Sequence, residues 1–195
     1  AGFIGLHLAR LLLKKNFKID LLDNFSIGLL DEELSKLLKH PNIKLIEKDL
    51  SNVNSYKMVD NDYDFIFHFA AILGVENVIN SPYEVLDRNV ILTLNALNIA
   101  KRQKSLKSFT FSSTSEVYAG TLENNLLKIP TKENSVIVLP ELVKPRTSYL
   151  LSKVYGEALC VQSNIPSIII RPNNIYGPRM GMSHVIPQLL KKSFL

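Results

Sequence analysis

The sequence predicts an α/β fold, a doubly wound parallel sheet covered by helices on both faces. Five short apolar segments, each bounded by polar or turn residues, alternate with longer segments in which apolar residues recur three and four positions apart. A parallel connection needs a crossover, and the intervening helices supply it. With 195 residues, 46% of them hydrophobic and 21% charged, the chain is long enough to bury a sizeable core.

Each element is expected where its pattern is clearest. The strands, expected to be buried, comprise residues 18–23, 44–47, 65–69, 109–112 and 167–171. The helices comprise residues 4–15, 31–39, 83–104, 148–163 and 185–192. Residues 119–147 contain three prolines and are expected to form a long surface loop, and loops of that length are usually functional.

Composition argues against several classes of protein. The longest apolar run, residues 65–75, is interrupted by His68 and is shorter than the roughly 18 residues that a membrane span needs. The chain start has no signal-peptide pattern, and the single Cys160 cannot form an internal disulfide, so we expect a cytoplasmic protein. The net charge of +5 comes from scattered Lys and Arg residues without interleaved aromatics, so we expect no nucleic-acid partner. No spacing of Cys, His, Asp and Glu predicts a metal site.

Two glycines and an aspartate indicate a dinucleotide site. Gly2 and Gly5 immediately precede an amphipathic helix, and small residues there let the helix N-terminus approach a pyrophosphate. Asp23 ends the next strand, eighteen positions after Gly5, where a carboxylate accepts hydrogen bonds from the adenosine ribose. Because that carboxylate would repel a 2′-phosphate, NAD is favoured over NADP. An aspartate at a strand end is otherwise a common turn residue, and its register with the glycines favours the cofactor interpretation.

Tyr149 and Lys153 lie four positions apart, on one face of an expected helix. A nearby ammonium stabilises a phenolate and lowers the pKa of the tyrosine from its ordinary value of about 10, which makes it a usable base near neutral pH. The pair alone is equally compatible with an exposed tyrosine and a solvated lysine on a surface helix.

Polar side chains follow the strand expected over residues 109–112, at the end where open α/β sheets bind ligands. They are Ser112, Ser113, Thr114, Ser115 and Glu116. Such side chains can hold a substrate, and a Ser/Thr cap that leads into a turn is the alternative. His68, by contrast, lies inside an apolar strand and is interpreted as a satisfied core residue.

Taken together and in order, these segments resemble the extended short-chain dehydrogenase/reductases, the family of NAD-dependent nucleotide-sugar epimerases, dehydratases and decarboxylases. Ala1-Gly2-Phe3-Ile4-Gly5 is similar to the end of the family's glycine-rich loop, and residues 22–28 are similar to its ribose and adenine segment. His68-Phe69-Ala70-Ala71 resembles the strand end that lines the cofactor. Residues 171–178 resemble the segment that reaches the nicotinamide and the substrate diphosphate.

The resemblance implies a Rossmann-like fold, NAD as cofactor and a nucleoside-diphosphate sugar as substrate. Tyr149 would take a proton from a sugar hydroxyl while hydride passes to NAD, Lys153 would bind the nicotinamide ribose, and Thr114 would hydrogen-bond the reacting oxygen. Ser115 and Glu116 would complete the catalytic group. Thr114, Glu116 and Asn174 would bind substrate. The implied cofactor-binding residues are Gly2, Phe3, Ile4, Gly5, Asp23, Asn24, Ser26, Gly28, Asp49, Leu50, Phe69, Ala70, Ala71, Ser112, Tyr149, Lys153 and Pro172.

The resemblance leaves the outcome of the reaction open. Family epimerases tend to have small or apolar residues after the threonine, and 4,6-dehydratases carry Thr-Asp-Glu. Thr114-Ser115-Glu116 is similar to the Thr-Ser-Glu of UDP-glucuronate decarboxylases, as is Lys144-Pro145-Arg146, whereas residues 71–75 look more like the epimerase pattern. A non-catalytic NAD-binding scaffold or sensor is the alternative from another class, and the intact Thr114, Tyr149 and Lys153 argue against it.

The resemblance also sets the expected organisation. Residues 1–182 are expected to form an NAD-binding domain, and residues 183–195 the start of a substrate-binding region. We expect a first strand upstream of Ala1, the rest of the substrate domain downstream of Leu195, and a homodimer when the protein is full length. The 195 residues alone are expected to be inactive.

Overall fold

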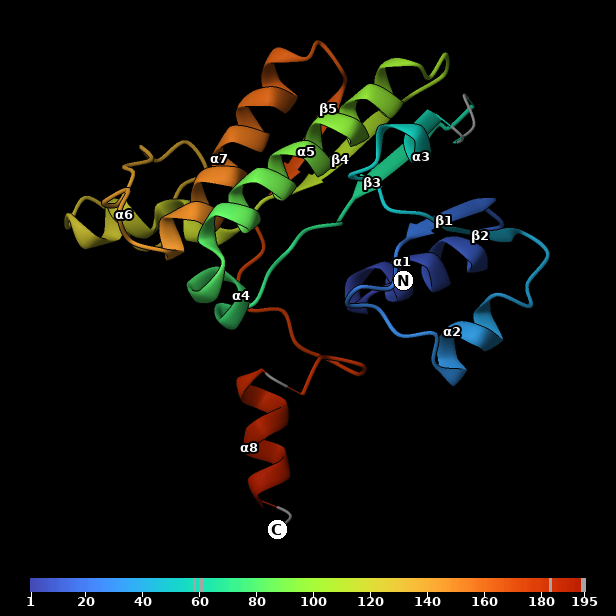
Figure 1. Cartoon of the computed structure of the whole chain (residues 1–195), viewed down its shortest axis with the longest axis horizontal. Helices are drawn as coiled ribbons and strands as arrows, with labels where there is room; N and C mark the ends of the chain where they lie inside the picture. The colour runs from blue at the N-terminus through green and yellow to red at the C-terminus, as the bar shows by residue number, and fades with distance from the viewer. Residues whose placement is uncertain (58, 60–61, 183, 194–195) are drawn as a thin grey trace. The chain divides into compact units, whose positions relative to one another are not determined.

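The computed structural model describes residues 1–57, 59, 62–182 and 184–193, which divide between two compact units. The first unit comprises residues 1–50 and 174–195, and the second comprises residues 51–173. Each unit has its own parallel sheet (Figure 1).

The first unit pairs two strands and packs helices on them. It contains α1 (Phe3–Lys14), β1 (Ile19–Asp23), α2 (Glu32–Leu37), β2 (Ile43–Glu47) and α8 (Val185–Ser193). β1 and β2 are parallel, with Ile19 opposite Ile43 and Asp23 opposite Glu47. Side chains of α1 and α2 meet those of the strands in two small clusters of buried residues, built around Leu6 with Leu34 and around Ala9 with Leu13. The apolar faces of α1 and α2 therefore cover this sheet, as their periodicity predicts, whereas α8 buries no residue.

The second unit is larger. It contains α3 (Val53–Lys57), β3 (Phe65–His68), α4 (Val75–Asn80), α5 (Pro82–Lys101), β4 (Ser108–Ser112), the 3₁₀ turn η1 (Ser115–Tyr118), α6 (Ala119–Glu123), α7 (Arg146–Gln162) and β5 (Ser167–Ile170). The strands are parallel in the order β3-β4-β5.

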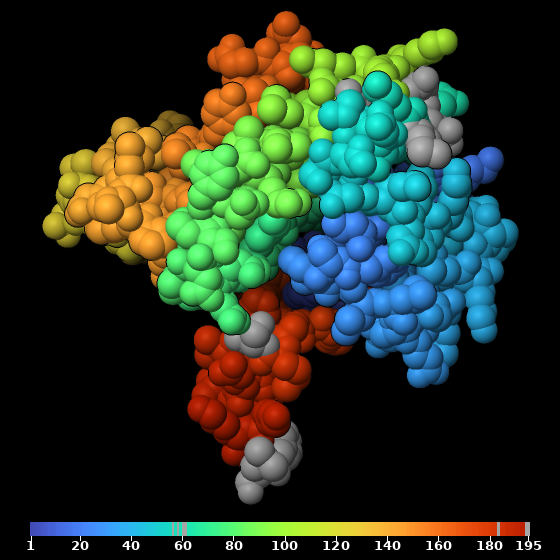
Figure 2. Space-filling model, viewed as in Figure 1, coloured from blue at the N-terminus to red at the C-terminus, as the bar shows by residue number. Residues whose placement is uncertain are grey.

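The core of the second unit lies between its sheet and the helix pair α5 and α7. These two helices run side by side (Figure 1), and their outer surfaces are continuous in the space-filling view (Figure 2). Phe109 and Phe111 of β4 are fully buried, and Val85 of α5 and Leu150 of α7 are 1% and 2% exposed. The central strand β4 is thus well buried beneath these two helices.

The structure confirms the α/β class with parallel strands, and it confirms the five predicted helices to within a few residues at each end. Among the described residues the strands pair as two parallel sheets, one of β1 and β2 and one in the order β3-β4-β5.

Two expectations, the burial of every strand and the loop over residues 119–147, need correction. The strands are not all buried: β3 exposes Phe65 and Phe67, and β5 exposes Ile168 and Ile170, because side chains alternate between faces and α5 and α7 cover only one of them. Residues 119–147 are not all loop either. They begin with α6, whose fully buried Thr121 hydroxyl donates to the Val136 carbonyl (2.8 Å) and accepts from the Val138 amide (3.1 Å).

Candidate nucleotide and catalytic site

One face of α7 holds the carboxyl end of β4. Tyr149, Lys153 and Glu157 follow one another at intervals of four residues along this helix, so their side chains share a face. Lys153 Nζ donates a hydrogen bond to the Ser112 carbonyl oxygen (2.8 Å). One residue further along the strand end, Ser113 Oγ donates to Glu157 Oε1 (2.5 Å). The sequence prediction that Tyr149 and Lys153 lie on one face of a helix is confirmed.

The close approach of α7 to β4 depends on Gly156. A Cβ atom at this position would lie 2.4 Å from Cζ of the Phe111 ring, well inside van der Waals contact. The absence of a side chain at Gly156 therefore lets the helix rest directly on the buried ring, which brings Lys153 within reach of the Ser112 carbonyl.

Lys153 is buried, with 5% of its surface exposed. Its Nζ lies 5.2 Å from the centroid of the Phe111 ring and 5.6 Å from that of Tyr149. Burial lowers the pKa of Lys153 to about 8, because the low-dielectric interior disfavours the ammonium. The alternative of a solvated surface lysine is wrong, and the ammonium form still predominates at neutral pH.

Tyr149 departs from the expected electrostatics. Burial, and secondarily the negative charge of Glu116, raise the pKa of Tyr149 to about 12. The expectation that Lys153 lowers this pKa is therefore not met by the residues of the chain alone, because Lys153 Nζ faces the ring and the Ser112 carbonyl while burial opposes the phenolate.

Thr114, Ser115 and Glu116 form the turn that follows β4. Thr114 Oγ1 accepts a hydrogen bond from the Glu116 amide (3.2 Å) and so caps η1. Ser115 Oγ donates to Asn173 Oδ1 (3.4 Å), and the Glu116 carboxylate lies 3.7 Å from Arg146. The alternative of a Ser/Thr cap is thus realised, but it does not compete with a binding role, since a hydroxyl that accepts one bond can still donate another.

The loop after β3, which contains Phe69, Ala70 and Ala71, is tied to both long helices. Asn89 of α5 is buried; its side chain accepts from the Ile72 amide (2.7 Å) and donates to the Ile72 carbonyl (3.0 Å). It also donates to Ser152 Oγ of α7 (3.4 Å). This link sets the end of the loop against the helix that carries Tyr149.

His68 is a core residue, as expected. It is 5% exposed and stacks on Phe109 and Phe111, with ring centroids 6.2 and 5.9 Å apart. Its Nε2 lies 3.4 Å from Thr93 Oγ1. Burial, with a smaller effect of the Lys153 charge, lowers the pKa of His68 to about 3, so the ring is neutral at physiological pH.

Several predicted cofactor residues of the first unit lie close to one another at the start of α1. The Ala1 nitrogen lies 2.8 Å from Asp23 Oδ2, so the glycine segment and the end of β1 are adjacent. Cβ atoms added at Gly2 and Gly5 would meet no described atom within 4 Å, which leaves room beside the helix N-terminus. Asp23 Oδ1 accepts from the Phe25 amide (2.8 Å), so this carboxylate also makes the turn bond that its position at a strand end suggested.

Residues 24–31 form a loop that approaches Asp23. A Cβ at Gly28 would lie 3.4 Å from Asp23 Oδ1, and Asn24 Oδ1 accepts from the Ser26 amide (3.1 Å). Arg179 fastens the loop, since its guanidinium bonds Asp31 (2.5 Å), the Leu29 carbonyl (2.8 Å) and the Ala1 carbonyl (2.7 Å). These are the groups that an adenosine and its diphosphate require: a carboxylate, open glycines and a helix N-terminus.

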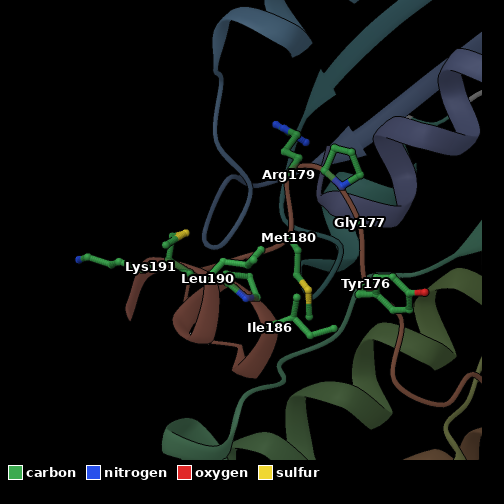
Figure 3. Close-up of a pocket in the computed structure, with 10 residues that line it drawn as sticks. Tyr176, Gly177, Arg179, Met180, Ile186, Leu190 and Lys191 are labelled. Atoms are coloured by element: carbon green, nitrogen blue, oxygen red, sulfur yellow. The ribbon is translucent and has the colours of Figure 1, made fainter. Parts of the chain in front are cut away.

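The remaining predicted residues divide between the units. Asp49, Leu50 and Asn174 belong to the first unit, and Pro172 belongs to the second, where its carbonyl accepts from the Ser115 amide (3.0 Å). The first unit also has an open hollow of about 470 Å³ between residues 176–182 and α8, where Met180 points toward Ile186 (Figure 3). Its lining includes Tyr176, Gly177 and Pro178, the end of the segment expected to reach the nicotinamide and the substrate diphosphate.

Sequence reasoning missed three residues of the second unit that support the site. Asn89 and Glu157 were assigned no role, and Arg171 was quoted only as part of a segment. Glu157 had a usable signal, because it continues the four-residue spacing of Tyr149 and Lys153. Asn89 and Arg171 act through partners 17 and 14 residues away, which no local pattern indicates.

Parallel strands joined by helices, with glycines at the start of α1 and an aspartate at the end of β1, define a nucleotide-binding protein of the Rossmann-like class. The chain belongs to the NAD dependent epimerase/dehydratase family, whose model matches residues 1–193.

Relatives of known name include enzymes of three kinds. The chain is 36% identical to UDP-N-acetyl-alpha-D-glucosaminuronate decarboxylase of Bacillus cytotoxicus over 98% of this chain and 58% of that protein. It is 33% identical to dTDP-D-glucose 4,6-dehydratase of Dictyostelium discoideum over 97% of this chain and 45% of that protein. The crystal structure of UDP-glucuronic acid 4-epimerase from Bacillus cereus in complex with UDP-glucuronic acid and NAD matches with a TM-score of 0.80 and 28% identity, over 99% of this chain and 60% of that one. The chain spans about half the length of the curated relatives it matches.

Proposed function

We propose that this chain is the NAD-binding part of an enzyme that modifies the sugar of a nucleoside diphosphate through a 4-keto intermediate, with the cofactor retained and recycled. The observation that carries the proposal is the arrangement of α7 on β4. Tyr149 and the buried Lys153 share a helix face, and Lys153 bonds the Ser112 carbonyl two residues before Thr114. Membership of the family supports the same conclusion.

The first unit would hold the adenosine and diphosphate of NAD. Gly2 to Gly5 would face the diphosphate at the start of α1, and Asp23 would accept hydrogen bonds from the ribose, with Asn24, Ser26, Gly28, Asp49 and Leu50 around it. The second unit carries the other residues proposed to bind NAD, which are residues 69–71, Ser112, Lys153 and Pro172. NAD, when bound, supplies the acceptor for the hydride from the sugar and a positive charge on its ring.

Side chains of the second unit would accept the proton that the sugar hydroxyl loses and bind the groups around it. Tyr149 accepts the proton of the sugar 4-hydroxyl, Thr114 hydrogen-bonds the same oxygen, and Lys153 donates to the nicotinamide ribose. Because burial raises the pKa of Tyr149 to about 12, its deprotonation depends on positive charge nearby. Lys153, whose pKa is lowered only to about 8, keeps its charge at pH 7 and supplies part of it.

Replacement of Tyr149 by Phe in the intact protein tests this function. The change removes the proton acceptor and little volume, so we expect keto-sugar formation to fall by about 10²–10⁴-fold while NAD stays bound. Absorbance of reduced nicotinamide after addition of a sugar nucleotide measures the first oxidation. Near-normal oxidation by this variant would show that Tyr149 is not the base, and absence of oxidation by the unaltered protein with every sugar nucleotide would favour a scaffold or sensor.

A decarboxylase is the more specific candidate, and the motif Thr114-Ser115-Glu116 favours it. The Glu116 carboxylate lies 3.7 Å from the guanidinium of Arg146, the first residue of the helix that carries Tyr149. A carboxylated sugar would find a cation in Arg146. The 36% identity to a sugar-acid decarboxylase supports the same candidate.

Product analysis by NMR separates the three outcomes. The substrates to test are UDP-glucuronate, UDP-N-acetylglucosaminuronate, UDP-glucose and dTDP-glucose. A decarboxylase releases carbon dioxide from the two uronates and from neither of the other two. We expect Glu116→Gln to impair decarboxylation or dehydration strongly, because each needs acid–base chemistry beyond the first oxidation. Epimer formation that is undiminished in Glu116→Gln would exclude both of these outcomes.

We further propose that the intact protein is a cytoplasmic homodimer without nucleic-acid or membrane partners. The single cysteine, Cys160, is buried, as suits a protein of a reducing compartment, and within the described ranges no helix is long and apolar enough to cross a membrane. Residues 183–195 would begin the substrate-binding region after the NAD-binding domain of residues 1–182, and Asn174 would contact the sugar nucleotide. Sedimentation of the intact protein tests the dimer.

A further inference from the structure

A buried ion pair lies one helical turn beyond Lys153. Arg171, which follows β5, donates from Nε to Glu157 Oε1 (2.8 Å) and from Nη2 to Glu157 Oε2 (2.6 Å). Glu157 is 7% exposed, and this two-point geometry is the strongest that an arginine and a carboxylate make. Pairing with Glu157 raises the pKa of Arg171 above its ordinary value.

The same pair reaches the strand end that carries Thr114. Ser113, which is 2% exposed, donates its hydroxyl to Glu157 Oε1 (2.5 Å), and its amide donates to the Ile170 carbonyl of β5 (2.8 Å). On the other side of Thr114, the Ser115 amide donates to the Pro172 carbonyl (3.0 Å). Thr114 is thus held between two anchored neighbours, one of which depends on Glu157.

Arg171 also connects the turn and the long segment that follow Thr114. Its Nη1 donates to the Tyr118 hydroxyl and to the Glu133 carbonyl (2.7 Å), and its guanidinium lies 5.1 Å from the centroid of the Tyr118 ring. Tyr118 in turn donates to the same Glu133 carbonyl (3.1 Å). One guanidinium therefore joins α7, η1 and the segment between α6 and α7.

The geometry rules out a direct chemical role for the Glu157 carboxylate. Both of its oxygens are already engaged by Arg171 or Ser113, and the group is buried. A buried carboxylate that accepts three such bonds holds its neighbours in place.

We propose that Glu157, held by Arg171, is a positioning residue that sets the place of Thr114 relative to Tyr149 through the Ser113 hydroxyl. Tyr149 and Glu157 are on one rigid helix, so the spacing between base and strand end is determined by two turns of α7. The inference rests on the proposed function, in which Thr114 bonds the reacting oxygen. A displacement near 1 Å at a reacting centre costs up to about 10²-fold in rate.

A double-mutant cycle on the intact, NAD-loaded protein tests the proposal. Ser113→Ala removes the link and leaves the ion pair, and Glu157→Gln weakens the pair. Ser163→Ala is the matched control, because it deletes a hydroxyl near the end of the same helix that bonds only local backbone groups, the Cys160 carbonyl (2.7 Å) and the Ile165 amide (3.2 Å). Each variant is measured alone and combined with Thr114→Ala.

We expect Ser113→Ala and Glu157→Gln to lower kcat by about 10- to 100-fold, with KM and NAD affinity within about threefold of normal, and Ser163→Ala to change neither. In the Thr114→Ala background the further loss from Ser113→Ala should shrink to less than about twofold, because the group that it positions is gone.

Two results would overturn the inference: an unchanged kcat in Ser113→Ala, or a loss from Ser113→Ala that is equally large with and without Thr114. The second would mean a general structural role. If Glu157→Gln does not fold, the Ser113→Ala cycle still decides the question. Full activity in Thr114→Ala itself would instead contradict the proposed function, so the two failures are distinguishable.

Discussion

The end of β4 and the start of α1 differ in how their polar groups are held. At the end of β4, successive residues bond to α7 or to their own turn: Ser112 to Lys153, Ser113 to Glu157 and Thr114 to the Glu116 amide. At the start of α1, added Cβ atoms at Gly2 and Gly5 would touch no described atom, and Asp23 is only half-buried. The polar groups at the end of β4, which we propose react with the sugar, are therefore held in place by other side chains of the chain, whereas the segment proposed to bind the nucleotide is open.

The first prediction concerns the start of α1 and is measured as a change in affinity for NAD. Asp23→Asn should weaken NAD binding by about 1.5–3 kcal/mol, because charge-assisted hydrogen bonds to the ribose are lost, and should relatively favour NADP. Isothermal titration of the intact protein measures both affinities. Glu47→Gln, at the paired position on β2, is the control and should change neither. Equal binding of NAD and NADP by the unaltered protein would contradict the role of Asp23.

The next effect tests the closeness of α7 and β4. Gly156→Ala should destabilise the protein by about 1–3 kcal/mol, because the new methyl group meets the fully buried Phe111 ring at 2.4 Å. Urea unfolding measures the change. Combination with Phe111→Leu should cost less than the sum of the two single changes, since the clash partner is smaller. Strict additivity would mean that Phe111 is not what excludes a side chain there.

The smallest expected effect is the pH dependence of the free energy of unfolding that His68 causes, in the core next to β4. The pKa of His68 is about 3 in the folded chain and 6.5 ordinarily, so between these values the unfolded state binds the extra proton. Stability should therefore fall as the pH falls through 6.5, by about 1.4 kcal/mol at pH 5.5 relative to neutral pH. Unfolding at pH 7.5 and 5.5 measures it. His68→Gln should lose less stability over this interval, and an equal loss in both proteins would assign the acid sensitivity to other groups.

Much of the fold could be predicted because long periodic segments report burial directly. The helices that became α1, α5 and α7 were identified from apolar residues three and four apart. The helices α3, α4 and α6, of five or six residues each, were missed because so short a segment contains too few turns to establish a period. Residues 119–147 were assigned to a loop from their prolines, and Thr121 shows how a buried hydroxyl can organise such a segment through contacts 15 and 17 residues away.

Local sequence patterns identify the candidate catalytic and cofactor-binding groups: a tyrosine and a lysine four apart, hydroxyls at a strand end, and an aspartate in register with two glycines. These signals are local, because helix and strand periodicity place them. The packing of the elements, by contrast, buries Lys153 against Phe111, raises the pKa of Tyr149 through burial, and lets Glu157 hold Ser113 from 44 residues away. The physical reason is that burial and long-range hydrogen bonds depend on which elements pack together, and a hydrophobic pattern states only that an element packs, not against what.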